Sequence, residues 1–264
     1  MAGYDPIEMR SGWRNPWGEN SKIVEFTATS NRHYMHQADI SFICDISAGL
    51  QSLGKIAPPG DTWTNGAFAD AKSALKEAFP SDEEWGPAAI IDEARKAFPQ
   101  NGVAAVDTGA HRILLSQIWQ CFAPRTLLQS KAFCTMGCAL PLAIGHRLAA
   151  PDTPVIAFTG DAGLEMVLGE LATLRDLKIP VIVLVFVDKS LALIELKQRS
   201  MGYDNLGVDF GNTDFPALAN AMGGAGILAE SRAQLSDAIT KGLANPGFTL
   251  ISCPIGHRPY EGRF

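Results

Sequence analysis

The chain has 264 residues, and 47% apolar residues are enough for a buried core in one large domain or in one and a half ordinary ones. Its 22 basic and 28 acidic side chains give a net charge of -6, which argues against nucleic-acid binding because a polyanion needs a basic face. No apolar run approaches the roughly 20 residues that cross a bilayer, and the N-terminal stretch lacks the apolar core of a signal peptide.

Residues 1–55 predict part of an α/β domain. The run KIVEFTA from Lys22 and the run ISFICD from Ile40 to Asp45 read as strands, and ISAGLQSLG after them reads as a helix.

Residues 56–100 predict a linker with helices that lead into the next domain. It opens with the proline- and glycine-marked stretch IAPPGDTWTNG. Helical patterns follow over Ala67 to Phe79 and over Trp85 to Phe98, the second preceded by acidic residues.

Residues 101–264 alternate between strands and helices. Strands are predicted near Val103 to Asp107, Val155 to Phe158, Val181 to Val187, Ala225 to Ala229 and Thr249 to Cys253. Such alternation favours a doubly wound parallel sheet with helices on both faces, and the fold class is therefore α/β. Ligands bind such sheets at the carboxyl ends of the strands, where Gly109, Asp161 and Asp188 fall.

The most informative segment runs from Pro154 to Ser190 and reads as strand, glycine turn, helix, strand. The turn places unpaired N–H groups beside the amino end of a helix, which attracts a phosphate. Asp161 and Asp188 each follow a strand, and carboxylate oxygens together with phosphate oxygens suit octahedral Mg²⁺. The pattern predicts an anion site that also holds a divalent cation.

At these residues the chain resembles the thiamin diphosphate (ThDP) enzymes of the acetolactate synthase group. Gly160-Asp161-Ala162 matches the first half of their metal motif. The second half is usually Asn-Asn, whereas this chain has Val187-Asp188. The resemblance implies that Asp188 ligates the metal in place of an asparagine and that the backbone carbonyl of Ser190 takes the next position.

Further segments carry the same resemblance, in order, from about Phe98 to Pro254. The stretch Val103 to Trp119 is similar to the family's first strand and diphosphate loop, and Lys131 to Ala149 is similar to the family segment Gly-Thr-Met-Gly-x-x-Leu-Pro-x-Ala-Ile-Gly. In that second segment Met136 matches the bulky residue that holds the cofactor in its bent conformation. The backbone oxygen of Cys134 would accept from the aminopyrimidine.

The resemblance therefore implies ThDP and Mg²⁺ as cofactors. The implied ThDP-binding residues are Gly109, Ala110, His111, Cys134, Met136, Gly160, Ala162, Gly163, Ser190, Leu191 and Ala192, and the implied metal ligands are Asp161, Asp188 and Ser190.

Two features have alternative interpretations. His111 begins a helix after a glycine turn, and it either reaches a phosphate or is a plain helix-start residue. Cys134 and Cys138 are four apart, which suggests a metal or redox pair, although small half-buried residues at a helix start are the more ordinary reading. The odd total of 5 cysteines suggests reduced thiols and a cytoplasmic location.

The catalytic glutamate of the family lies on a separate pyrimidine-binding domain, and nothing in this chain matches that domain. Glu165, Glu170 and Glu195 lie on predicted helices and none is at the expected place. We expect a split enzyme, a heterodimer or heterotetramer. In it a separately encoded partner subunit supplies the pyrimidine domain, its glutamate and the first half of the central domain. The resemblance also implies that residues 1–55 are only the second half of that central domain. Half of a sheet exposes an edge and an apolar face, so we expect something else to cover them.

The resemblance implies a 2-oxo acid decarboxylase or carboligase that is active only with this partner. Leu191, Leu193 and Ile194 would form an apolar wall suited to an aliphatic or aromatic 2-oxo acid. Lys197 replaces a tryptophan of the acetolactate synthases. It either covers the helix surface or attracts an anionic group of the substrate.

Two other classes of function stay open. One is a ThDP-dependent carbon–carbon lyase that cleaves a 2-hydroxyacyl thioester or a diketone. The other is a non-catalytic relic or regulatory subunit, against which the retained Asp161, Met136 and glycine turns argue.

Overall fold

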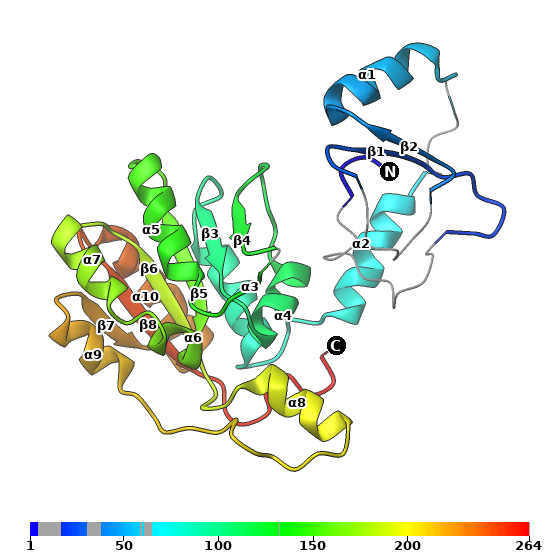
Figure 1. Cartoon of the computed structure of the whole chain (residues 1–264). Coiled ribbons are helices and arrows are strands. Elements are labelled where there is room, and N and C mark those ends of the chain that lie inside the picture. Colours follow the sequence, from blue (N-terminus) through cyan, green and yellow to red (C-terminus); the bar gives the residue numbers. More distant parts are fainter. Residues whose placement is uncertain (5–16, 31–37, 59, 61–64, 132, 264) are drawn as a thin grey trace. The chain divides into compact units, whose positions relative to one another are not determined.

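The computed structural model describes residues 1–4, 17–30, 38–58, 60, 65–131 and 133–263 (Figure 1). The chain divides into two compact units, Met1–Ala67 and Phe68–Phe264. Each unit is described by itself below.

The first unit contains two parallel strands and a helix. β1 (Val24–Thr27) pairs with β2 (Ile40–Ile43), with Val24 opposite Ile40. α1 (Ile46–Ile56) begins after Asp45, whose carboxylate accepts from the backbone N–H of Ala48 at 2.8 Å and so caps the helix. The predicted order of strand, strand and helix is confirmed. All four residues of β2 are exposed.

The second unit is an alternating α/β domain (Figure 1). Its helices are α2 (Ala67–Ala78), α3 (Pro87–Ala97), α4 (Ala110–Ile118), α5 (Ala139–Ala149), α6 (Asp161–Glu165), α7 (Glu170–Leu177), α8 (Ala192–Ser200), α9 (Phe215–Ala221) and α10 (Arg232–Ala244). Its strands are β3 (Val103–Val106), β4 (Leu127–Gln129), β5 (Val155–Gly160), β6 (Ile182–Val187), β7 (Ala225–Leu228) and β8 (Thr249–Pro254).

The six strands form one parallel sheet in the order β4-β3-β5-β6-β8-β7. Successive strand residues point to opposite faces, so each face has its own core. One face packs on α3, α4 and α10, and the other on α5, α7 and α9. Both layers are visible in Figure 1. This confirms the predicted doubly wound α/β fold.

Two parts of this unit differ from a simple reading of the pattern. β4 is a short, half-buried strand at the sheet edge that the sequence did not predict. α3 lies in the stretch we read as linker and lead-in helices, yet Ile90 and Ile91 are fully buried in the core beside α4 and α10. Trp85 fixes the start of this segment, since its indole N–H donates to the carbonyl of Pro254 at 2.7 Å.

Among the helices that the structure describes, none combines the length and apolar character required to cross a membrane.

Candidate functional site

A pocket lies where β3, β5 and β6 end, at the carboxyl edge of the sheet. Its volume is about 790 Å³, including the part that is open to solvent. The predicted cofactor, metal and substrate residues that line it are Gly109, Ala110, His111, Cys134, Met136, Gly160, Asp161, Ala162, Gly163, Asp188, Ser190, Leu191, Ala192, Leu193 and Ile194. Lys197 is not among the lining residues and is exposed on α8.

His111 opens α4 directly beneath the pocket. Its ring is buried and stacks on Phe186 with the ring centroids 5.4 Å apart. Burial lowers the pKa of His111 to about 4, although the negative charge of Asp107 opposes the shift. The imidazole is therefore neutral near pH 7, and its buried Nε2 has no hydrogen-bond partner in the structure. A buried nitrogen in this state is a ready contact for a ligand in the pocket.

The glycines beside His111 leave room for its imidazole. A Cβ placed on Gly109 would lie 2.7 Å from Cε1 of the His111 ring, and one on Gly160 would lie 3.4 Å from the same atom. Any larger residue at Gly109 would displace the imidazole. The bare turns after β3 and β5 thus let the imidazole pack close to the backbone, and they place no side chain over the turns where a phosphate would bind.

Asp161 connects the turn after β5 with the turn after β6. Its Oδ2 accepts from the backbone N–H groups of Asp188 at 3.1 Å and Lys189 at 2.7 Å, and its Oδ1 accepts from that of Ala162 at 2.8 Å. Burial raises the pKa of Asp161, while these three donors act in the opposite direction. Lys189 has a φ of 59°, which lets the chain turn back toward Asp161.

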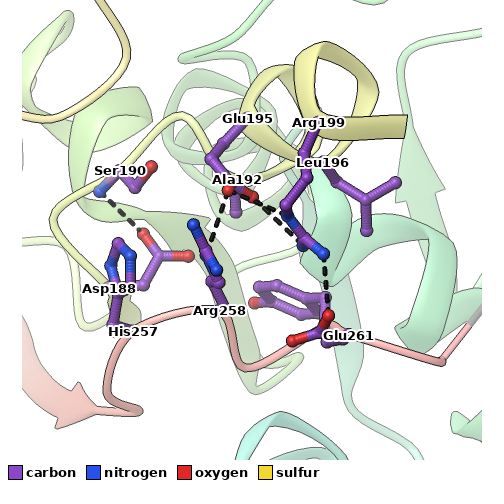
Figure 2. A pocket seen from close by; sticks show the side chains of 10 residues that line it. Asp188, Ser190, Ala192, Glu195, Leu196, Arg199, His257, Arg258 and Glu261 are labelled. Carbon is purple, nitrogen blue, oxygen red and sulfur yellow. Dashed lines mark hydrogen bonds and ion pairs between the residues drawn. The ribbon is translucent and has the colours of Figure 1, made fainter. Parts of the chain in front are cut away.

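Asp188 lies at the end of β6 and accepts from the backbone N–H of Ser190 at 3.2 Å (Figure 2). Burial, with the charge of Asp161 as the second cause, raises the pKa of Asp188 to about 7. Asp161 is buried and Asp188 is half-buried. Two neighbouring carboxyl groups with raised pKa values repel each other when ionised, and a cation between them would relieve this.

Within the described part of the chain, no set of three or more His, Cys, Asp or Glu side chains is arranged to hold a metal ion. A Mg²⁺ ion commonly takes only one or two carboxylates and completes its octahedron with phosphate and other oxygens. Asp161 and Asp188, both at the pocket, fit a site of that kind. The backbone carbonyl of Ser190 could add a further oxygen.

The turn over residues 133–138 forms another wall of the pocket. Cys134 and Gly137 both have left-handed backbone conformations, with φ of 52° and 82°. Met136 lines the pocket and is half-buried. The Cys134 sulfur lies 3.2 Å from a guanidinium nitrogen of Arg112. All 5 cysteines are free thiols, and burial together with Asp107 raises the pKa of Cys138 to about 11.

Two residues at the site were not assigned a role from the sequence. Asp107 ends β3 with its side chain fully buried, accepting from the turn over residues 133–138 and from Thr159. It could have been noticed, because it follows a buried strand as Asp161 and Asp188 do. Tyr260 lines the pocket from the C-terminal segment, and burial with the nearby charges of Asp188 and Asp161 raises its pKa far above the ordinary value. Nothing in the local sequence signals this.

The three glutamates discussed above are not among the residues that line the pocket. Glu165 accepts a short hydrogen bond from the hydroxyl of Thr213. Glu170 starts α7. Glu195 is buried and pairs with Arg199 and Arg258, each with a closest distance of 3.1 Å (Figure 2).

A small adjoining hollow is lined by α8 and the C-terminal segment. Figure 2 shows how Glu195 lies between the two arginines and how Arg199 reaches on to Glu261, 2.7 Å away. These ion pairs attach residues 258–261 to α8. Because Tyr260 lies in the attached segment, they also hold one wall of the main pocket.

A parallel α/β domain with a glycine-lined anion pocket and two carboxylates at its strand ends defines a diphosphate-binding domain. Residues 107–253 match the family described as "Thiamine pyrophosphate enzyme, C-terminal TPP binding domain", in which thiamine pyrophosphate is ThDP. The match covers more than half of the chain. The chain belongs to this family.

Several curated relatives are acetolactate synthases. The chain is 28% identical to an acetolactate synthase of Bacillus subtilis over 97% of this chain and 46% of the relative. It is 25% identical to the catabolic acetolactate synthase of Raoultella terrigena, over 97% of this chain and 47% of that relative. It is 32% identical to the acetolactate synthase isozyme 1 large subunit of Escherichia coli, over 70% of this chain and 33% of that relative. The chain thus spans less than half the length of these relatives.

Proposed function

We propose that this chain binds ThDP with Mg²⁺ as the diphosphate-binding subunit of a 2-oxo acid decarboxylase or carboligase. The observation that carries the proposal is the pocket itself. It joins a buried, unpartnered His111 nitrogen, bare glycine turns and the carboxyl groups of Asp161 and Asp188. Relatives named as acetolactate synthases support the same class of reaction.

The chain's own residues would hold the cofactor at two ends. Asp161, Asp188 and the Ser190 carbonyl would hold the metal, and Gly109, Ala110 and Gly163 would leave the diphosphate space near the backbone. Met136 would support the bend between the two rings of the cofactor. When bound, ThDP supplies the carbanion chemistry that a 2-oxo acid needs for loss of CO₂. Binding and orientation are the contribution of this chain.

The activating glutamate would come from outside the described pocket. The lining residues include no glutamate, and Glu195 is occupied by two arginines. We propose that a pyrimidine-binding domain on a separately encoded partner subunit brings this carboxylate to the open side of the pocket. The active assembly would then be a heterodimer or heterotetramer.

The substrate side of the pocket favours an apolar 2-oxo acid. Leu191, Leu193 and Ile194 line it. Lys197 is exposed and lies outside the lining, so it has no part in this proposal. An aliphatic or aromatic side chain of the substrate would remove this apolar surface from water.

The test is reconstitution. The purified chain is assayed with ThDP, Mg²⁺ and a panel of 2-oxo acids, alone and with a candidate partner that carries a pyrimidine-binding domain. We expect CO₂ release and an aldehyde or hydroxyketone product with the partner only. Turnover by the chain without a second polypeptide would contradict the partner proposal. Binding of ThDP without CO₂ release from any 2-oxo acid would contradict the proposed reaction.

A further inference from the structure

Asp107 lies beneath the pocket at the end of β3, and its carboxylate joins three separate segments of the pocket. Its side chain is fully buried. Oδ2 accepts from the backbone N–H of Gly137 at 2.8 Å and from the hydroxyl of Thr159 at 2.9 Å. Oδ1 accepts from the backbone N–H groups of Thr108 at 2.8 Å and Cys138 at 3.0 Å.

These partners belong to different walls of the pocket. Thr108 begins the loop that carries Gly109 and His111, whereas Gly137 and Cys138 follow directly after Met136. Thr159 lies on β5, immediately before Gly160. A single side chain therefore sets the spacing between the predicted diphosphate side and the wall formed by Met136.

The surroundings fit this carboxylate closely. A Cβ on Gly163 would lie 2.3 Å from Asp107 Oδ2 and 3.0 Å from Thr159 Oγ1. Gly137 has a φ of 82°, and a Cβ there would lie 2.8 Å from Cγ1 of Val167. Glycine at 163 lets α6 pack closely against the carboxylate, and glycine at 137 lets the turn over residues 133–138 pack against Val167 while its N–H donates to Asp107.

From these contacts we infer that Asp107 is a positioning residue, which fixes the wall carrying Cys134 and Met136 relative to the diphosphate loop. The inference rests on the proposed ThDP function. Asp107 is not among the pocket-lining residues, so it acts through the backbone groups that it holds.

Asn at this position distinguishes positioning from simple space filling. Asparagine has the same shape, but one carboxylate oxygen becomes an NH₂ donor. Gly137 and Cys138 donate to different oxygens, so either orientation of the amide leaves one of their N–H groups facing a donor. The turn loses a buried hydrogen bond in both cases.

The first measurement is hydrogen exchange of the full chain without cofactor. In Asp107→Asn we expect exchange in residues 133–138 to rise roughly 10-fold or more, because a buried N–H is left unpaired. Exchange in β6 should change much less. The control is Asp92→Asn on α3, outside the pocket, which removes a carboxylate paired with Lys96 and Arg232. It should leave exchange in residues 133–138 unchanged.

The second measurement compares two ligands in the presence of Mg²⁺. ThDP would touch both walls, whereas inorganic diphosphate would touch only the diphosphate loop and the metal. We expect Asp107→Asn to weaken ThDP binding by roughly 10- to 100-fold and diphosphate binding by clearly less. If this variant does not fold, Thr159→Val is used in its place, because it removes one donor to Oδ2. It should also weaken ThDP binding more than diphosphate binding, but by a smaller factor.

Three outcomes would overturn the positioning role: unchanged exchange in residues 133–138, an equal rise of exchange throughout the sheet, or equal weakening of both ligands. A different result would count against the proposed function instead. If the unaltered chain binds no ThDP, the proposed cofactor fails, and the role of Asp107 toward that cofactor fails with it.

Discussion

The backbone N–H of Asp188 donates to the Asp161 carboxylate, with 3.1 Å between the nitrogen and Oδ2. The two acidic residues are 27 positions apart in the chain, yet this bond holds the end of β6 against the start of α6. Both carboxyl groups are thereby placed at the same pocket. Replacing either residue tests a different part of the arrangement.

Asp161→Ala should abolish Mg²⁺-dependent binding of ThDP. It removes a metal ligand and also the acceptor for the backbone of Asp188 and Lys189. Asp188→Asn should keep most of the binding, since an amide oxygen can ligate in place of the carboxylate oxygen. Calorimetric titration of both variants with and without Mg²⁺ measures this. Unchanged ThDP affinity in Asp161→Ala would refute the metal assignment.

His111 should make stability depend on pH in one window. Its pKa is about 4 in the native state, against an ordinary value of 6.5, so between these values the unfolded chain binds more protons. The free energy of unfolding should therefore rise from pH 4 to pH 6.5 and level off above it. One pKa unit corresponds to about 1.4 kcal/mol, which makes roughly 3 kcal/mol the upper limit.

The comparison is with His111→Phe, which keeps an aromatic ring on Phe186 and has no titratable group. Urea unfolding of both chains from pH 4 to pH 8 gives the difference in stability at each pH. A difference that is constant over the range would show that the imidazole is not held neutral by burial.

Met136→Ala should lower turnover of the reconstituted enzyme far more than it lowers stability. The side chain is half-buried at the pocket, so the cost to folding should fall below the roughly 2–5 kcal/mol of a fully packed methionine. A displaced reacting group costs about 100-fold in rate. ThDP binding should weaken moderately, because the metal residues are untouched. Turnover and thermal melting of the variant measure the two effects. A variant with normal turnover but a much lower melting temperature would identify Met136 as a core residue.

Glu195→Gln should loosen the C-terminal segment. The buried carboxylate of Glu195 pairs with Arg199 and Arg258. The neutral amide of Gln carries no negative charge, so both guanidinium groups lose an ion pair. Since the arginines are partly exposed, we expect a loss of only about 1 kcal/mol, together with faster hydrogen exchange at the backbone N–H groups of residues 260–263. Glu261→Gln is the matched control. Its carboxylate is 61% exposed, so the loss of its pair with Arg199 should loosen the segment less than the loss of the buried Glu195 carboxylate. Equal exchange rates in residues 260–263 of the two variants would contradict the assignment.

The strands of the second unit were predictable because both faces of a parallel sheet are buried. β5 and β6 are therefore continuous apolar runs that stand out from the sequence. β4 was not predicted, since three half-buried residues at an edge carry no such run. The acidic residues at the ends of β5 and β6 followed from the same pattern, and together with the glycine turn they indicated the pocket.

Other parts of the site depend on contacts between distant segments. Tyr260 lies at the pocket because it is buried in the core while the Glu195–Arg258 pair attaches its segment to α8, and no local pattern encodes this. Asp107 follows a strand, but its four principal donors come from residues 108, 137, 138 and 159. Local sequence patterns do not reveal hydrogen bonds between segments that are far apart in the chain.

The pocket walls come from residues 108–111, 134–136, 160–163, 186–194 and 260. These segments meet only after β3, β5 and β6 have paired in parallel, and such non-local pairing is slow to form. A chain still being synthesised would therefore have no complete binding site until almost all of this unit had emerged from the ribosome. A ligand of this pocket can stabilise the finished domain by mass action, but it cannot guide the early steps of folding.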